Sequence, residues 1–132
     1  MEERKKILIV EDEAGIVKPL AMKLKLSGFD VKSAADGEEG LDAMSKEKFD
    51  LVLLDLMMPR VDGFEVLTKL RERKDHTPVI VATNLNQPSD VSRVFELGCT
   101  NYYVKSDTTL EQIVEISREA LKNPPHEDLI KL

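Results

Sequence analysis

The stretch Leu51–Gly63, LVLLDLMMPRVDG, begins with four apolar residues, and an acid, Asp55, follows them directly. An unbroken apolar run of this length is typical of a strand covered on both faces, as in a parallel sheet with helices on each side. Similar runs of strand length recur along the chain, at Ile7–Val10 and Val79–Ala82, with weaker ones at Val31–Ala34 and Tyr102–Val104. The sequence therefore predicts five strands.

Segments of helical periodicity alternate with these strands, with expected bounds at about residues 14–27, 38–45, 63–73, 88–97 and 110–121. The last helix carries a capping-box signature, Thr108 with Glu111. Pro19 lies inside the first helix, where we expect a kink or a loose first turn. This repeated alternation predicts the α/β class, with a doubly wound five-stranded parallel sheet in a single domain.

Composition restricts the class of protein. The chain has 132 residues, a formal net charge of −6, a pI near 5.0 and basic residues scattered among acids. We expect no direct nucleic-acid binding, which requires clustered basic side chains, and no membrane segment, because no apolar window is long enough. With one cysteine, Cys99, and no recognisable signal peptide, a cytoplasmic protein is expected. The domain should cover residues 1–122, and residues 123–132 should be a disordered tail rather than a docking segment or linker.

Polar side chains follow four of the expected strands. Glu11 and Asp12 come after the first, Asp55 after the third and Thr83 after the fourth, and Lys105 ends the fifth. Ligands of doubly wound sheets bind beyond the carboxyl ends of the strands, so these groups should lie together. Neighbouring carboxylates repel one another unless some are protonated or a cation lies among them. Oxygen ligands favour a hard ion, and Mg²⁺ fits best because it commonly shares its coordination shell with a phosphoryl group.

The same residues suggest a reaction. Asp55 can attack phosphorus as a nucleophile and form an aspartyl phosphate. Lys105 supplies a fixed positive charge and Thr83 a hydroxyl donor, both suited to phosphoryl oxygens. Catalysis of such a transfer consists largely of positioning and of charge neutralisation. We therefore expect Asp55 to take up a phosphoryl group in the presence of Mg²⁺.

Four motifs together resemble the receiver domain of two-component response regulators: ILIVEDE at Ile7–Glu13, LVLLDLMMPRVDG at Leu51–Gly63, Thr83, and YYVK at Tyr102–Lys105. The match covers about residues 5–122. It implies the flavodoxin-like (βα)5 fold with strand order 2-1-3-4-5, which is carried over from the family. It also implies a signalling phosphoacceptor rather than an enzyme, with intrinsic Mg²⁺-dependent self-phosphorylation and slow self-dephosphorylation.

The resemblance implies roles for single residues at the metal site. Asp12 and Asp55 would bind Mg²⁺ directly, and Glu11 would act through water. The backbone carbonyl of Met57 would be a further ligand. Asp62 and Gly63 would shape the loop that follows the phosphorylated residue.

The resemblance also implies a signalling route. The phosphoryl donor would be a phosphohistidine on a sensor histidine kinase or a phosphotransfer protein. Thr83 would then shift toward the phosphoryl group, and Tyr102 would turn inward as the switch. No DNA-binding segment follows Leu132 in this sequence, so we expect the output to be an altered surface for a downstream protein target. That surface would be the face of the fourth helix, fifth strand and fifth helix, and homodimerisation is left open.

Some residues depart from the family pattern. Ser106 follows Lys105 where proline is usual, so the cis peptide common there is in doubt. Asn84 follows Thr83 where a small residue is usual, and it could either narrow access to Asp55 or hydrogen-bond near the phosphoryl oxygens. Two further positions influence hydrolysis of the aspartyl phosphate in this family, and both are apolar here, Met57 and Leu85. Because neither can position a water, we expect a long-lived phosphoryl group.

Other interpretations of the same residues stay open. Asp12 alone would more often cap a helix, and Lys105 could merely pair with Asp55. Tyr102 or Tyr103 could be an ordinary core aromatic. The methionines Met57 and Met58 are first interpreted as core-filling side chains.

Rival functions can be weighed by the residues that they require. A flavin carrier of the same fold needs a phosphate loop rich in Ser, Thr and Gly, whereas the loop here is EDE. A phosphatase with an aspartyl-phosphate intermediate usually needs a second acid two residues after the nucleophile, where this chain has Met57. A receiver-like module that binds a partner without being phosphorylated is kept open by Asn84 and Ser106.

Overall fold

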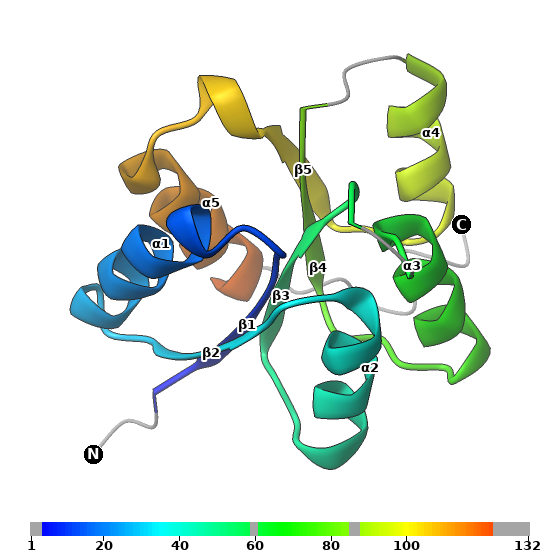
Figure 1. Cartoon of the computed structure of the whole chain (residues 1–132), viewed down its shortest axis with the longest axis horizontal. Helices are drawn as coiled ribbons and strands as arrows, with labels where there is room; N and C mark the ends of the chain where they lie inside the picture. Colours follow the sequence, from blue (N-terminus) through cyan, green and yellow to red (C-terminus); the bar gives the residue numbers. More distant parts are fainter. Residues whose placement is uncertain (1–3, 59–60, 85–87, 123–132) are drawn as a thin grey trace.

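The computed structural model describes residues 4–58, 61–84 and 88–122, which form a five-stranded parallel sheet (Figure 1). The strands are β1 (Lys6–Val10), β2 (Asp30–Ala34), β3 (Leu51–Asp55), β4 (Val79–Thr83) and β5 (Asn101–Val104). Their order across the sheet is β2-β1-β3-β4-β5, and all neighbouring pairs run parallel. The predicted class and strand order are confirmed. The expected tail, residues 123–132, lies outside the described residues.

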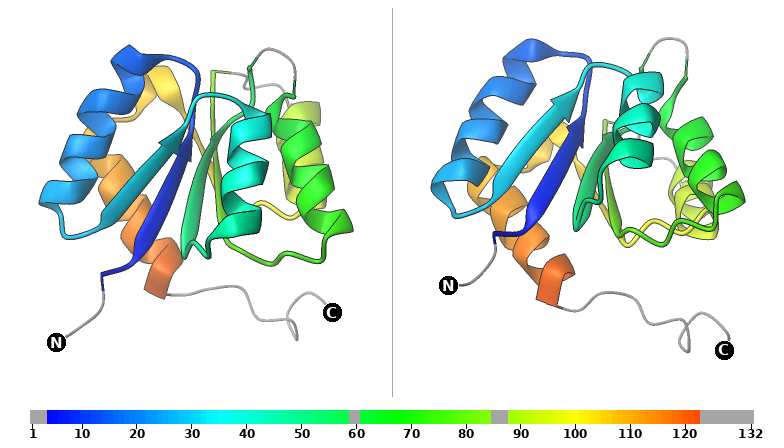
Figure 2. Two further views of the ribbon diagram at one scale, coloured as in Figure 1. Left: turned by 60° about the horizontal axis from the view of Figure 1, so that its bottom comes forward. Right: turned by 90° about the horizontal axis from the view of Figure 1, so that it is seen from below.

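Helices cover both faces of the sheet (Figure 2). They are α1 (Ala14–Leu26), α2 (Gly37–Lys46), α3 (Gly63–Glu72), α4 (Pro88–Glu96) and α5 (Leu110–Lys122), with a short 3-10 helix, η1 (Lys105–Asp107), after β5. Helices α1 and α5 lie on one face, and α2, α3 and α4 lie on the other. Within the described part of the chain, no helix is both long enough and apolar enough to cross a membrane.

The apolar core is divided by the sheet into two layers. Along β1, Ile7 and Ile9 pack on the side of α1 and α5, whereas Leu8 and Val10 pack on the side of α2, α3 and α4. Side chains of a strand alternate between the two faces, so a strand buried on both sides needs an unbroken apolar sequence. Each fully buried aliphatic side chain stabilises the fold by about 1.5–3 kcal/mol. This explains the apolar run that precedes Asp55.

Helix ends follow local sequence signals. Asp36 caps α2, and Asp62 caps α3 by accepting a hydrogen bond from the Glu65 N–H at 3.0 Å. Gly28 and Gly98 follow α1 and α4 with positive φ angles of 103° and 91°, which glycine adopts without steric cost. Helix α1 continues through Pro19.

The capping box of α5 lies one residue later than predicted. The Thr109 side chain accepts the Gln112 N–H at 3.1 Å, and the Gln112 side chain accepts the Thr109 N–H at 2.9 Å. Thr108 instead donates its hydroxyl hydrogen bond to the Val104 carbonyl at 2.8 Å. The predicted pair of Thr108 and Glu111 is therefore wrong, because η1 places Thr108 over the end of β5 rather than at the start of the helix.

Gly63 brings the start of α3 against the end of β3. Its N–H donates to the Leu56 carbonyl at 3.1 Å. A Cβ at this position would lie 2.7 Å from the Leu56 Cα and 2.8 Å from the Asp55 carbonyl oxygen. Only glycine fits this close approach without a backbone shift. The loop after Asp55 is thereby held next to the strand end.

Candidate functional site

The carboxyl end of the sheet brings together two buried acids. Glu11 directly follows β1, Asp55 is the last residue of β3, and their exposed fractions are 5% and 3%. Asp12 lies beside them and is exposed to solvent. One carboxylate oxygen from each of the three acids lies within 4.8 Å of the others. The predicted acidic cluster is therefore present in the fold, formed by strands that are neighbours in space.

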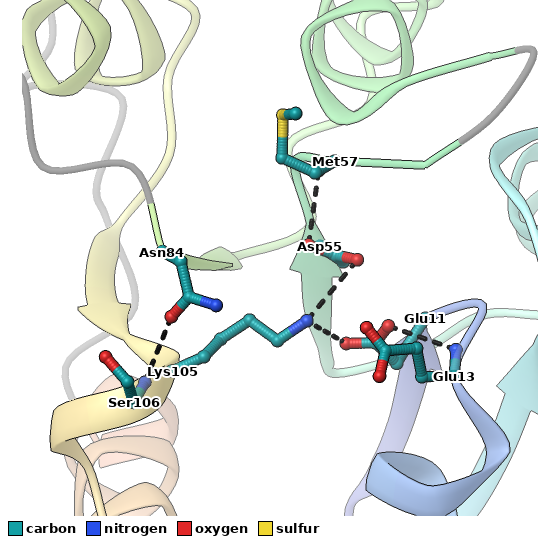
Figure 3. A network of polar contacts seen from close by, with 7 residues as sticks. All are labelled: Glu11, Glu13, Asp55, Met57, Asn84, Lys105 and Ser106. Atoms are coloured by element: carbon teal, nitrogen blue, oxygen red, sulfur yellow. Dashed lines mark hydrogen bonds and ion pairs between the residues drawn. The ribbon is translucent and has the colours of Figure 1, made fainter.

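Lys105 reaches the same acids from η1 (Figure 3). Its Nζ lies 2.6 Å from Glu11 Oε1 and 3.5 Å from Asp55 Oδ2, and its side chain is 14% exposed. The interpretation of Lys105 as a simple partner of Asp55 is thus incomplete, because its shorter contact is to Glu11. The residue connects the ends of β1, β3 and β5 through one ammonium group.

Burial and mutual repulsion make Asp55 unusual among the carboxylates. Burial, followed by the negative charge of Glu11, raises the pKa of Asp55 to about 7, although Lys105 and the Met57 N–H oppose the rise. Burial also acts to raise the pKa of Glu11, but the hydrogen bonds from Lys105 and from the Glu13 N–H outweigh it, so this pKa lies below its ordinary value. Partial protonation of Asp55 near neutral pH relieves the repulsion in the absence of a cation.

Backbone donors orient both buried carboxylates. The Met57 N–H donates to Asp55 Oδ1 at 3.2 Å, and the Glu13 N–H donates to Glu11 Oε2 at 3.2 Å. The Met57 side chain points away from Asp55 in Figure 3 and is 61% exposed. The interpretation of Met57 as core-filling is therefore wrong, whereas Met58 is buried in the core. The chain leaves the sheet at Met57, and Met57 contacts the Asp55 carboxylate through its backbone N–H and not through its side chain.

The donor set at this site fits a hard divalent cation. The first helix is capped at Glu13, without a side-chain capping bond, so Asp12 does not act as the cap of α1. It is left exposed next to two buried acids. All three candidate ligand groups are carboxylates, and Mg²⁺ prefers oxygen ligands while keeping several waters. A cation held by Glu11, Asp12 and Asp55 would also remove the repulsion that raises the pKa of Asp55.

Thr83 of β4 and Tyr102 of β5 line the same small gap, on the side of the sheet that α4 covers. Thr83 is the last residue of β4 and is buried. Tyr102 is half-buried, and both side chains line a small gap under α4 together with Val94. Tyr102 also meets the Phe95 ring edge-on, with 6.0 Å between the ring centroids. Its neighbour Tyr103 is buried in the opposite layer and fits the core-aromatic interpretation, whereas Tyr102 is only partly buried against its own layer.

The two loop residues that depart from the family pattern form a hydrogen bond with each other. The Ser106 N–H donates to Asn84 Oδ1 at 3.1 Å, although 22 positions separate the two residues (Figure 3). The peptide between Lys105 and Ser106 is trans, since the described residues contain no cis peptide bond. Sequence reasoning identified both residues but missed their pairing. Leu85, the other position of interest in this loop, lies outside the described residues.

Comparisons with known proteins agree on one family. Residues 7–117 match the model of the response regulator receiver domain. The probable transcriptional regulator ycf27 of Porphyridium aerugineum is 46% identical over 103 residues, which are 78% of this chain and 42% of that protein. The alkaline phosphatase synthesis transcriptional regulatory protein PhoP of Bacillus subtilis is 44% identical over 101 residues, 76% of this chain and 42% of that protein. The chain thus spans about two fifths of the length of these relatives.

A solved structure supports the same assignment. The chemotaxis protein CheY4 of Vibrio cholerae superposes with a TM-score of 0.83 at 28% sequence identity. The superposition covers 89% of this chain and 98% of that one. This likeness agrees with the flavodoxin-like fold that the family resemblance implies, and with the doubly wound α/β class that the alternation of strands and helices predicts.

Proposed function

This chain belongs to the response regulator receiver domain family of two-component systems, and from this premise we propose that Asp55 is its phosphoacceptor. The donor would be a phosphohistidine on a sensor histidine kinase or a phosphotransfer protein, and the reaction would depend on Mg²⁺. The observation that carries the proposal is the buried Asp55 carboxylate, which ends a central strand next to Glu11 and Lys105. An ionisable group in that position costs stability, so a structural role explains it poorly.

The proposed transfer moves one phosphoryl group between two residues. A carboxylate oxygen of Asp55 attacks phosphorus, the phosphorus–nitrogen bond of the phosphohistidine breaks, and its electron pair returns to the imidazole nitrogen. Lys105 would neutralise charge on the phosphoryl oxygens, which its Nζ can reach from its present position 3.5 Å from Asp55 Oδ2. The Met57 N–H keeps Oδ1 occupied at 3.2 Å. Both carboxylate oxygens of Asp55 are thus held in position, Oδ1 by the Met57 N–H and Oδ2 by Lys105.

The metal site of the proposal uses the acidic cluster. Asp12 and Asp55 would bind Mg²⁺ directly, Glu11 would bind through water, and the backbone carbonyl of Met57 would complete the protein ligands. Bound Mg²⁺ supplies positive charge for the phosphoryl oxygens and holds them in position. The support for this assignment is that three carboxylate oxygens lie within 4.8 Å of one another with one of the acids open to solvent. Glu11 also anchors Lys105, so metal and lysine would share its charge.

The proposed output is a change on the face formed by α4, β5 and α5. Thr83 would move toward the phosphoryl group, and Tyr102, which now lines the same narrow gap under α4, would turn inward as α4 adjusts. Such a movement would break the edge contact of Tyr102 with Phe95, which is partly exposed on this face. The altered face would bind a downstream protein target or a second copy of the chain. We propose no direct contact with nucleic acid, in line with the net charge of −6, and a cytoplasmic location.

A slow loss of the phosphoryl group is part of the proposal. Met57 follows the phosphoacceptor by two positions, its side chain is apolar, and it points away from Asp55 (Figure 3). It offers no polar group to orient a water for in-line attack on phosphorus. We therefore propose a phosphoryl lifetime well above seconds. A half-life of seconds that polar substitution at this position leaves unchanged would contradict it.

The experiment is phosphorylation by a small donor. The protein is incubated with acetyl phosphate or phosphoramidate, with and without Mg²⁺, and intact mass is measured against the Asp55→Asn variant. We expect one added phosphoryl group that requires Mg²⁺ and is absent from the variant. A failure with both small donors and also with sensor kinases would contradict the proposal and favour a module that binds its partner without phosphorylation. An adduct on the variant would move the site away from Asp55.

A further inference from the structure

A hydrogen bond joins the two loops that carry the proposed phosphoryl-binding residues. Its acceptor, Asn84, directly follows Thr83, and its donor, Ser106, directly follows Lys105. The bond spans 3.1 Å between Ser106 N and Asn84 Oδ1, and both residues are exposed. An exposed hydrogen bond between neutral groups contributes little to stability, because both groups can bond to water instead. Its main consequence is therefore the orientation of the Asn84 side chain.

The bond determines which way the Asn84 amide faces. A backbone N–H can only donate, so the atom opposite Ser106 has to be the amide oxygen, and the amide nitrogen has to face away. In Figure 3 this nitrogen lies on the side of the Asn84 group that faces Asp55 and the end of Lys105. The Asn84 nitrogen carries two N–H donors. In this view both donors lie on the side of Asn84 that faces the Lys105–Asp55 contact.

We propose that Asn84 is an additional phosphoryl-binding residue, whose amide nitrogen donates a hydrogen bond to a phosphoryl oxygen on Asp55. This inference rests on the proposed function and adds a donor to those of Lys105 and Thr83. Ser106 is a positioning residue that acts through Asn84 by its backbone N–H alone. The two departures from the family pattern form one unit, because proline at position 106 would lack the N–H and a small residue at position 84 would lack the amide.

The opposite role for Asn84 would be a gate that hinders access to Asp55. A gate slows entry and exit of a ligand equally and leaves its equilibrium affinity unchanged, whereas a direct donor raises that affinity. The hydrogen bond from Ser106 holds the Asn84 oxygen at the neighbouring loop and leaves the amide nitrogen on the side of Asp55 in Figure 3. This orientation favours the donor role. Equilibrium binding of a phosphoryl mimic therefore separates the two roles.

The experiment measures the affinity for beryllofluoride in the presence of Mg²⁺ by titration, followed by NMR of the backbone amides. We expect Asn84→Ala to weaken binding by roughly tenfold, as the loss of one hydrogen bond to a charged group predicts. Asn84→Asp keeps the oxygen for Ser106 but has no N–H and adds negative charge, so it should bind more weakly still. Thermal unfolding of each variant checks that the fold is kept.

Ser106 supplies the matched control. Ser106→Ala removes the hydroxyl and keeps the backbone N–H, so its affinity should equal that of the wild type. Ser106→Pro removes the N–H and should weaken binding in the wild-type background, but not further in the Asn84→Ala background. The Ser106 amide resonance should shift in Asn84→Ala, a change that reports the bond without any ligand.

The outcomes distinguish this inference from the proposed function. If wild-type protein binds no beryllofluoride and accepts no phosphoryl group, the proposed function fails. If wild-type protein binds and Asn84→Ala binds equally well or more tightly, the donor role of Asn84 is wrong. Faster phosphorylation of Asn84→Ala at unchanged affinity would identify a gate and would also overturn the inference.

Discussion

The two ends of the sheet bury side chains of opposite kinds. At the carboxyl end, Glu11 and Asp55 are nearly inaccessible to solvent and Lys105 is mostly covered. At the amino end, the buried side chains Leu51 and Val79 are apolar. The polar groups at this end belong to the backbone and are paired, as in the hydrogen bond from the Thr100 N–H to the Val79 carbonyl at 2.7 Å. Protein interiors ordinarily contain apolar side chains and exclude charged ones. The amino end, which we call the apolar end, follows this rule, and the carboxyl end, which we call the charged end, does not.

This difference separates stability from function. Removing apolar surface from water stabilises the fold, whereas burying a carboxylate beside another costs free energy unless a cation compensates. Proteins keep buried charged groups that lower stability mainly at functional sites, where these groups act on a ligand. Mutations at the amino end should therefore lower stability and leave the site chemistry intact. Mutations of the charged residues at the carboxyl end should impair the site chemistry and should preserve or raise stability.

Leu51→Ala tests the apolar end and should have the largest effect on stability. We expect the free energy of unfolding to fall by about 2–5 kcal/mol, because a wholly buried leucine leaves a cavity. The folded fraction should still be phosphorylated on Asp55. Denaturant unfolding and intact mass measure the two quantities. As a control, Leu26→Ala alters a side chain that is 81% exposed and should change stability by less than about 0.5 kcal/mol.

Asp55→Asn tests the charged end, and without metal it should stabilise the fold by as much as about 4 kcal/mol near pH 8. Burial raises the pKa of Asp55 to about 7, above the value of about 4 in an unfolded chain. The aspartate therefore destabilises the fold increasingly as pH rises through this interval, and the two proteins should converge near pH 4. Unfolding in EDTA at a series of pH values measures this, with the exposed-site variant Asp42→Asn as control. A less stable Asp55→Asn protein would contradict the electrostatic account.

Mg²⁺ should stabilise the wild-type fold by about 1.4 kcal/mol at a concentration tenfold above its dissociation constant. The reason is that a cation among Glu11, Asp12 and Asp55 removes their repulsion. Thermal unfolding with Mg²⁺ and with EDTA measures the difference. Asp12→Ala should remove most of it, because this acid is exposed and its loss leaves the core packing unchanged. An equal response in Asp12→Ala would place the ion elsewhere.

Cys99 near the amino end of β5 should show the smallest effect, namely no reaction with a thiol reagent in the native state. Burial raises the pKa of its thiol to about 12, so thiolate is scarce at neutral pH and the reagent has little access. One thiol should react after unfolding in denaturant. Rapid labelling of the native protein would show that this end opens more readily than its packing indicates.

Much of the fold was accessible to sequence reasoning because its signals are local. The apolar run at Leu51–Leu54 predicted the central strand to within one residue, and Gly28 and Gly98 marked the ends of two helices. The capping box failed by one residue, because Thr108 bonds to the Val104 carbonyl across η1. Met57 was expected in the core, yet it is exposed where the chain leaves the sheet.

By itself, the sequence determined the class of the fold, the five strands and the residues at their carboxyl ends, since periodicity and strand ends can be read from neighbouring residues. Only the tertiary structure decided how those residues pair: Lys105 contacts Glu11 more closely than Asp55, and Ser106 bonds to Asn84. Both contacts join segments that are far apart in the chain and become neighbours through the order of the strands. Distances of this kind follow from the packing of the whole sheet, and no local pattern contains them.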